Sequence, residues 1–288
     1  MNTVIVIDSC SDLPRDFVEK NNIPSLGINV VLNGREFVDD FGKTVTYKEF
    51  YDAVREGEMP TTAQVNSETY KEEFLKHVKE NKSIIYLAFS SGLSGSINSA
   101  NIAKSEILEE YENADITIID TKSASLGEGL IVYYAYDMLK KGCSKEEIVN
   151  WVEKNKLKVN HWVIADDLNH LKRGGRISGT QAVVGTLLNI KPVIKVDDEG
   201  RLIPVAKVKG RKKALKTLVD KFREKVVNPE EQVIFISHSD CASDAELVKS
   251  MILEEFKVKD FIINQIGPGI GSHTGIGTVT LFFMGDSR

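Results

Sequence analysis

Cysteines are scarce in this chain, and long apolar runs are absent. Its 288 residues include three cysteines, Cys10, Cys143 and Cys241, whose spacing fits neither a zinc site nor a disulfide framework. We read them as free thiols, which are typical of a reducing compartment. No apolar run approaches the length of a membrane span, and the N-terminus lacks the basic start and apolar core of a secretory signal. We therefore expect a cytoplasmic protein without an integral membrane segment.

The chain also lacks an excess of positive charge. It has 37 lysines and arginines against 42 aspartates and glutamates, which gives a net charge of -5. Because nucleic-acid binding needs a dominant basic surface, we expect no nucleic-acid partner. The basic stretch at residues 207–216 is a local exception that fits a solvated helix start or a docking patch for an acidic partner. No ligand spacing for a metal is present, and we expect no cofactor.

The first half of the chain alternates short apolar strands with amphipathic helices, which predicts an α/β fold with a parallel, helix-flanked sheet. Asp8 and Ser9 directly follow the first of these strands. Ligand sites in such sheets favour the carboxyl ends of the strands. We expect strands at residues 3–7, 83–89 and 115–120, and helices at residues 67–80 and 94–111.

The second half mixes strands, helices and hairpin turns, which predicts an α+β lobe with a largely antiparallel sheet. Asn33-Gly34 in the first half and Asp198-Glu199-Gly200 in the second are hairpin turn sequences. We place the boundary near residue 158, so that the lobes cover residues 1–158 and 159–288. Strands of the second lobe are expected at residues 162–165, 191–196, 202–208, 233–237 and 261–265.

A turn rich in serine and glycine follows the strand at residues 83–89 and precedes a helical pattern. It reads Ser90-Ser91-Gly92-Leu93-Ser94-Gly95-Ser96. Free N–H groups at a helix start and short hydroxyls can bind a carboxylate or a phosphate, and glycines let the ligand approach the backbone. N-capping by Ser94 or Ser96 is the structural alternative. The density of serine and glycine favours an anion site.

Two further segments carry polar groups before or after predicted elements. Thr61 and Thr62 follow Pro60 in a polar loop before a helix, where their hydroxyls could cap the helix or bind a ligand. We expect a glycine-rich loop at residues 267–277, where five glycines surround His273, a density that core packing alone explains poorly. His273 could donate to a carboxylate, orient a hydroxyl or act as a base, or it could be merely structural.

Two arginines bracket a Gly-Gly turn within residues 168–177. Arg173 and Arg176 can each make planar, bidentate contacts with a carboxylate or a phosphate. A basic helix end followed by glycine fits the same residues equally well.

Together these motifs resemble the DegV family, which includes the fatty-acid-binding subunits (FakB) of bacterial fatty acid kinase. The resemblance spans essentially the whole chain, about residues 3–286. The sequence departs from the family pattern at Ala63, at Val65-Asn66 and at Ile276. The matching segments are Asp8-Ser9 with Ser11-Asp12-Leu13, Pro60-Thr61-Thr62 with Gln64, Ser90 to Gly95 with Asn98-Ser99-Ala100, residues 171–177, Ile190-Lys191-Pro192 and the glycine-rich segment around His273.

This resemblance implies a two-lobed DegV-like fold with a long-chain fatty acid buried between the lobes. The carboxylate of the acid would bond to the hydroxyls of Thr62 and Ser94 and connect to His273. A separate ATP-binding kinase subunit would phosphorylate the acid to an acyl phosphate, so this chain would be a carrier and not an enzyme. Arg173 and Arg176 would dock that subunit or contact the acyl phosphate. The implied supporting residues are Asp8, Ser9, Thr61 and Gly95.

A serine hydrolase is the main alternative from another functional class. Ser94, Asp120 and His273 occur in an order that a nucleophile, an acid and a base can have. The segment Gly92-Leu93-Ser94-Gly95 nevertheless lacks the G-x-S-x-G spacing of a nucleophile elbow. The sequence therefore favours the carrier.

Overall fold

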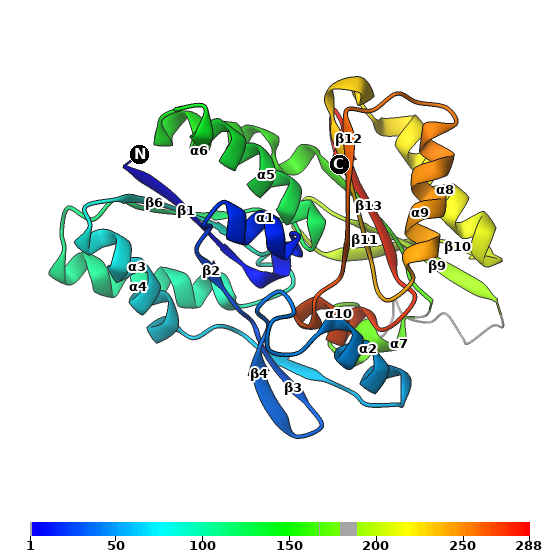
Figure 1. The fold of residues 1–288 in the computed structure, drawn as a ribbon, viewed down its shortest axis with the longest axis horizontal. Coiled ribbons are helices and arrows are strands. Elements are labelled where there is room, and N and C mark those ends of the chain that lie inside the picture. Colours follow the sequence, from blue (N-terminus) through cyan, green and yellow to red (C-terminus); the bar gives the residue numbers. More distant parts are fainter. Residues whose placement is uncertain (1, 167, 179–188) are drawn as a thin grey trace.

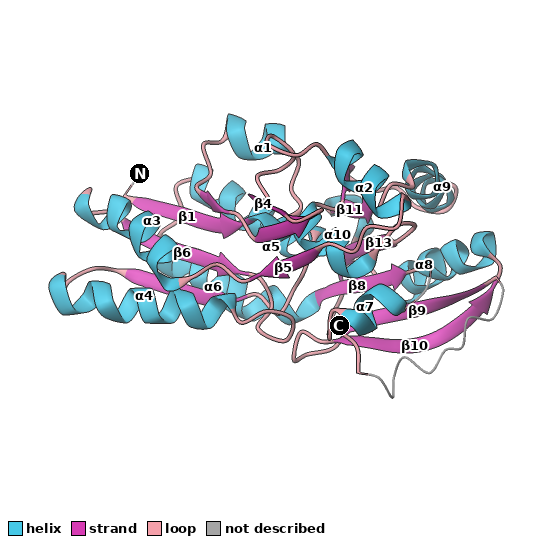
Figure 2. Ribbon diagram, turned by 90° about the horizontal axis from the view of Figure 1, so that it is seen from below, coloured by secondary structure: helices cyan, strands magenta, loops and turns pink. Residues whose placement is uncertain are grey.

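Two β-sheets, one from each half of the chain, form the frame of the molecule and lie toward its two ends (Figures 1 and 2). The computed structural model describes residues 2–166, 168–178 and 189–288. Every strand pair in the first sheet is parallel, so the expected parallel sheet is confirmed. This sheet contains, in spatial order, β2 (Ser25–Leu26), β1 (Thr3–Asp8), β6 (Ser83–Ala88) and β7 (Ile116–Asp120).

Helices cover both faces of the first sheet because its strands are apolar on both sides. Val6 and Ile84 pack toward α3 (Ser67–Lys79) and α4 (Ser96–Glu110). Ile5 and Ile85 face the opposite way. Their side of the sheet is covered by α1 (Arg15–Lys20), α5 (Leu126–Lys140) and α6 (Lys145–Asn155).

In the described part of the chain, the second sheet has six strands and is antiparallel except for one parallel pair at its edge. The expectation of a largely antiparallel lobe is confirmed. Its outer face packs against α8 (Arg211–Lys225) and α9 (Ala242–Leu253), as Figure 1 shows. The strands are, in spatial order, β10 (Leu202–Lys209), β9 (Ile190–Val196), β8 (Val159–Ile164), β13 (Val279–Met284), β11 (Val233–His238) and β12 (Asp260–Gln265).

A small antiparallel sheet projects from the first lobe. Its hairpin joins β3 (Asn29–Leu32) to β4 (Arg35–Val38), and Asn33 and Gly34 have φ of 54° and 72°. These positive values are what a type I′ turn requires, so the expected hairpin is confirmed. After α2 (Tyr47–Arg55), the chain forms β5 (Thr61–Ala63), which pairs with β3. The sequence had indicated a loop there, because a three-residue strand carries no periodic pattern.

Two short helices, α7 (Asn169–Arg173) and α10 (Pro268–Thr274), lie between the lobes. The glycine-rich segment around His273 was expected to be a loop, and it is mostly helix. Its glycines permit close packing instead. A Cβ on Gly271 would lie 2.7 Å from the hydroxyl oxygen of Tyr51, and one on Gly269 would lie 3.1 Å from a carboxylate oxygen of Asp39.

One apolar core runs through both lobes. It joins residues of the first sheet, such as Ile85, to Phe235 and Phe282 of the second through the buried face of α5. The boundary expected near residue 158 lies just before β8, but the lobes share this core. Within the described residues, no helix is both long and apolar enough to span a membrane.

Candidate functional site: a cavity between the lobes

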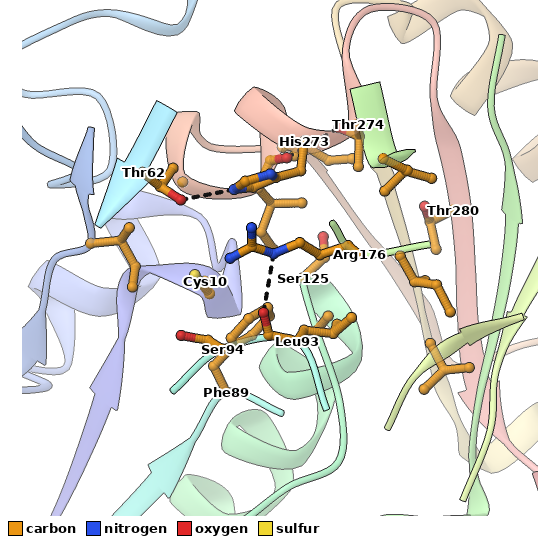
Figure 3. A pocket seen from close by; sticks show the side chains of 18 of the residues that line it. Cys10, Thr62, Phe89, Leu93, Ser94, Ser125, Arg176, His273, Thr274 and Thr280 are labelled. Carbon is orange, nitrogen blue, oxygen red and sulfur yellow. Dashed lines mark hydrogen bonds between the residues drawn. The ribbon is translucent and has the colours of Figure 1, made fainter. Parts of the chain in front are cut away.

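A cavity of about 300 Å³ lies where the two lobes meet. This volume is at the lower end of the range for small-molecule sites. Thr62, Ser94, Arg176 and His273 give the cavity a polar group of side chains (Figure 3). Its apolar lining comes from both lobes and includes Ile28, Phe89, Leu93, Val163, Val196, Leu202, Ile270 and Phe282.

Thr62 and His273 meet across the cavity wall. Pairing of β5 with β3 sets Thr62 opposite Val30, and the last turn of α10 carries His273. Thr62 Oγ1 lies 2.8 Å from His273 Nε2, within hydrogen-bond distance (Figure 3). Among the described residues, the buried His273 Nδ1 has no hydrogen-bond partner. It lies against Gly174, where a Cβ would come within 2.2 Å.

The surroundings of His273 favour its neutral form. Burial lowers its pKa to about 4, and the positive charges of Arg176 and Arg173 act in the same direction. A neutral imidazole has one donor and one acceptor nitrogen. With Nδ1 unpaired, a proton on Nε2 would be donated to Thr62 Oγ1 and would leave the hydroxyl proton of Thr62 available to a ligand.

Ser94 lines the cavity in the turn before α4. Its Oγ lies 3.0 Å from Ser96 Oγ and accepts a hydrogen bond from the Ser96 N–H at 3.2 Å. It thus satisfies one amide at the helix start while still facing the cavity. Gly95 follows, and a Cβ there would lie 2.3 Å from Gln64 Oε1, so glycine allows these two loops to touch.

The other supporting residues that the resemblance implies, Asp8, Ser9 and Thr61, do not line the cavity. Asp8 is buried and accepts hydrogen bonds from the Tyr86 hydroxyl and from the Phe89 N–H. Burial raises its pKa to about 6, against the effect of these bonds. Ser9 Oγ accepts a bond from the Ile28 N–H at 3.1 Å, so it fixes a cavity-lining segment. Thr61 is exposed and does not line the cavity.

The two arginines diverge. Arg176 is partly buried, lines the cavity and donates through Nε to the carbonyl of Leu93 at 3.2 Å (Figure 3). Arg173 is exposed and lies within 2.9 Å of His170 Nδ1 and 2.8 Å of Met59 Sδ. Of these two arginines, only Arg176 therefore lines the cavity together with Thr62 and Ser94.

The wall from the second sheet was not found from the sequence. Thr280 and Phe282 lie on β13, a strand that the sequence reading did not include. The alternation of threonine with apolar residues at 278–282 was a signal that could have revealed it. His161 of β8 was also missed. Its Nδ1 is 3.0 Å from the Val159 carbonyl, and its Nε2 faces Gly127.

The residues suggested for a hydrolase do not form a hydrogen-bonded triad in the described part of the chain. His273 is bonded to Thr62, and Ser94 to Ser96. Asp120 accepts bonds from the N–H groups of Ser91 and Lys122. No catalytic relay follows from these contacts.

Comparison with known proteins decides the family. The family model described as "Uncharacterised protein, DegV family" matches residues 2–286. The chain belongs to the DegV family. A DegV domain-containing protein of Clostridium perfringens is 52% identical over 285 residues, which cover 99% of this chain and 98% of the relative.

Solved DegV structures share the fold along the full chain. A DegV family protein from Thermus thermophilus, described as fatty acid binding, is 31% identical with a TM-score of 0.89, and the match covers 99% of this chain and 100% of that one. A DegV lipid-binding protein from Thermotoga maritima is 30% identical with a TM-score of 0.88, and the match covers both chains fully. The expected DegV-like fold is confirmed.

Proposed function

We propose that this protein binds a long-chain fatty acid in the cavity between its lobes. The observation that carries the proposal is a cavity with a largely apolar lining that also holds Thr62, Ser94, Arg176 and His273. An amphiphile with one polar end fits this distribution. The solved DegV relative from Thermus thermophilus, described as fatty acid binding, supports the choice of ligand.

The tail and the head group of the acid have separate roles in binding. Each methylene removed from water contributes about 0.8 kcal/mol, so the apolar lining supplies most of the affinity. A buried carboxylate needs charge-assisted hydrogen bonds to stay ionised. The hydroxyls of Thr62 and Ser94 would donate to it, with His273 holding Thr62 in place.

We further propose that the protein is a carrier that presents its acid to an ATP-binding kinase subunit, which forms the acyl phosphate. Cationic side chains near the carboxylate support this role, because a phosphate is bound well by planar guanidinium groups. Arg176 faces the cavity and would contact the acyl phosphate. Arg173 is exposed nearby and would contact the partner.

Native mass spectrometry of protein purified from its own cells tests the fatty-acid proposal. We expect the protein to carry a mass that matches one long-chain acid, released on denaturation. If no long-chain acid co-purifies and the delipidated protein binds none when it is added, the proposal is wrong.

A serine-directed fluorophosphonate probe separates the carrier from a hydrolase. We expect no stoichiometric labelling, because Ser94 has no histidine partner in the described contacts. Labelling of Ser94 that disappears in Ser94→Ala would favour the hydrolase.

A further inference from the structure

The cavity wall formed by the second sheet carries hydroxyl groups among its apolar side chains. β8 and β13 pair so that Thr280 lies opposite Val163, and Phe282 lies opposite His161. Side chains two residues apart point to the same face of a strand. Thr280 therefore points to the same face of the sheet as Val163 and Phe282, and all three residues line the cavity.

Thr280 differs from the other hydroxyl residues of this cavity in having no hydrogen-bond partner. The residue is 5% exposed, and the contacts of the described residues include no hydrogen bond for its hydroxyl. The hydroxyl faces the cavity, and covering it with a purely hydrocarbon chain would cost about 1 to 3 kcal/mol relative to a bonded hydroxyl. The other hydroxyls that line the cavity, those of Thr62, Ser94, Ser125, Thr274 and Thr278, all bond within the protein.

Thr280 is also remote from the proposed carboxylate site. In Figure 3 it lies on the opposite side of the cavity from Thr62 and Ser94. A ligand whose carboxylate lies at Thr62 and Ser94 would therefore meet Thr280 with its chain. Valine has nearly the same shape as threonine and would line a purely hydrocarbon path without the unpaired hydroxyl.

We infer that Thr280 recognises an oxygen atom on the acyl chain, so that the preferred ligand is a long-chain fatty acid with a chain hydroxyl or keto group. This inference rests on the fatty-acid function proposed above. The threonine hydroxyl donates to a keto oxygen or exchanges a hydrogen bond with a hydroxyl. The ligand oxygen gains a hydrogen-bond partner between the apolar side chains of Val163 and Phe282, and the unpaired hydroxyl of Thr280 is satisfied.

Binding measurements on delipidated protein test the inference. The ligands are stearic acid and a series of monohydroxystearic acids that differ in the carbon that carries the hydroxyl. We expect at least one hydroxy acid to bind Thr280→Val about threefold to tenfold more weakly than the natural protein, as loss of one neutral hydrogen bond predicts. Stearic acid should bind Thr280→Val at least as tightly as it binds the natural protein.

Two variants serve as controls. Thr280→Ser keeps the hydroxyl and should retain the preference for the hydroxy acid. Thr278→Val removes a hydroxyl of the same wall that already donates to the Thr274 carbonyl at 3.3 Å, and the ratio of the two affinities should not change. An unchanged ratio in Thr280→Val for every hydroxy acid would overturn the inference. Failure of the natural protein to bind any of the acids would instead overturn the fatty-acid function.

Discussion

At the scale of single residues, the cavity depends on side chains that the chain brings together from distant positions. Thr62 and His273 are 211 positions apart, and their hydrogen bond joins a strand of the first lobe to α10. Ser94 reaches the same cavity from the start of α4. Each group therefore lines the cavity only while the elements that carry it keep their places.

Removing either hydroxyl should weaken fatty-acid binding. A hydrogen bond to a charged group contributes about 1.5 to 3 kcal/mol, so Thr62→Val and Ser94→Ala should each lower the affinity for a long-chain acid about tenfold or more. Displacement of a fluorescent fatty acid measures this. Thr61→Val is the matched control, because Thr61 is the exposed neighbour on the same strand and should bind normally. Equal losses in Thr61→Val and Thr62→Val would contradict the assignment.

His273 should make stability depend on pH in a predictable direction. Its folded pKa of about 4 is below the ordinary value of 6.5. As the pH falls from about 6.5 to 4, His273 becomes protonated in the unfolded chain but stays neutral in the folded protein, so the free energy of unfolding decreases. His273→Gln lacks this loss. We expect the stability of the natural protein relative to His273→Gln to fall by about 2 kcal/mol between pH 7.5 and 4.5.

Urea unfolding of both proteins at several pH values gives this difference directly. Other titrating groups, including Asp8 with its raised pKa, occur in both proteins and largely cancel. A difference that does not vary with pH would show that His273 is not held in its neutral form by the fold.

Sequence motifs identified the polar residues of the cavity, but they did not predict which side chains face it. Ser94, Thr62 and His273 were all named from the sequence, and all line one cavity. Arg173 and Arg176 were predicted to share a role, yet only Arg176 faces the cavity. The turn between them has Gly175 at φ 74°. The directions of the two arginine side chains on either side of it depend on tertiary contacts, which no local sequence pattern encodes.

At the scale of elements, α10 is held by carboxylates of the first lobe. Asp12 accepts a hydrogen bond from the Gly267 N–H at 2.8 Å, and Asp39 accepts one from the Gly269 N–H at 2.9 Å. Burial raises the pKa of Asp39 to about 7 and raises that of Asp12 well above its ordinary value, against the effect of these hydrogen bonds. The sequence could not reveal this arrangement, because Asp39 is 230 positions from its partner. This contact accounts for Gly267 and Gly269, where a Cβ would lie 2.9 Å and 3.1 Å from Asp39 Oδ2.

Asp39→Ala should therefore destabilise the protein. The substitution leaves the Gly269 N–H buried without its acceptor, which costs about 1 to 3 kcal/mol of unfolding free energy. Asp39→Asn keeps an acceptor oxygen and should recover part of the loss. Glu36→Ala, at an exposed carboxylate of the neighbouring β4, is the control and should have a near-native melting temperature. A near-native melting temperature in Asp39→Ala would exclude this role for the carboxylate.

At the scale of the whole molecule, a shared apolar core and a partly buried arginine, Arg288, join the two lobes. The core surrounds α5 and could be foreseen only in part, since periodicity shows that a helix face is buried but not which sheet covers it. Arg288 uses all five of its N–H donors within the protein. It donates to the carbonyls of Lys122, Lys156, Val159 and Asp197 and to Ser123 Oγ, at 2.8 to 3.2 Å.

Replacing Arg288 should weaken the junction between the lobes. Its acceptors belong to both lobes, and burial lowers the pKa of its guanidinium group to about 10. Arg288→Ala removes the hydrogen-bond donor of several carbonyl groups at once, and we expect the free energy of unfolding to fall by about 2 to 4 kcal/mol. Arg288→Lys keeps the charge but has three donors in place of a planar fork, so it should recover less than half of the loss.

Urea unfolding measures each effect. The control is Arg35→Ala, since Arg35 is exposed and its replacement should change the free energy of unfolding little. Similar stabilities for Arg288→Ala and Arg35→Ala would mean that the shared core suffices to hold the lobes together.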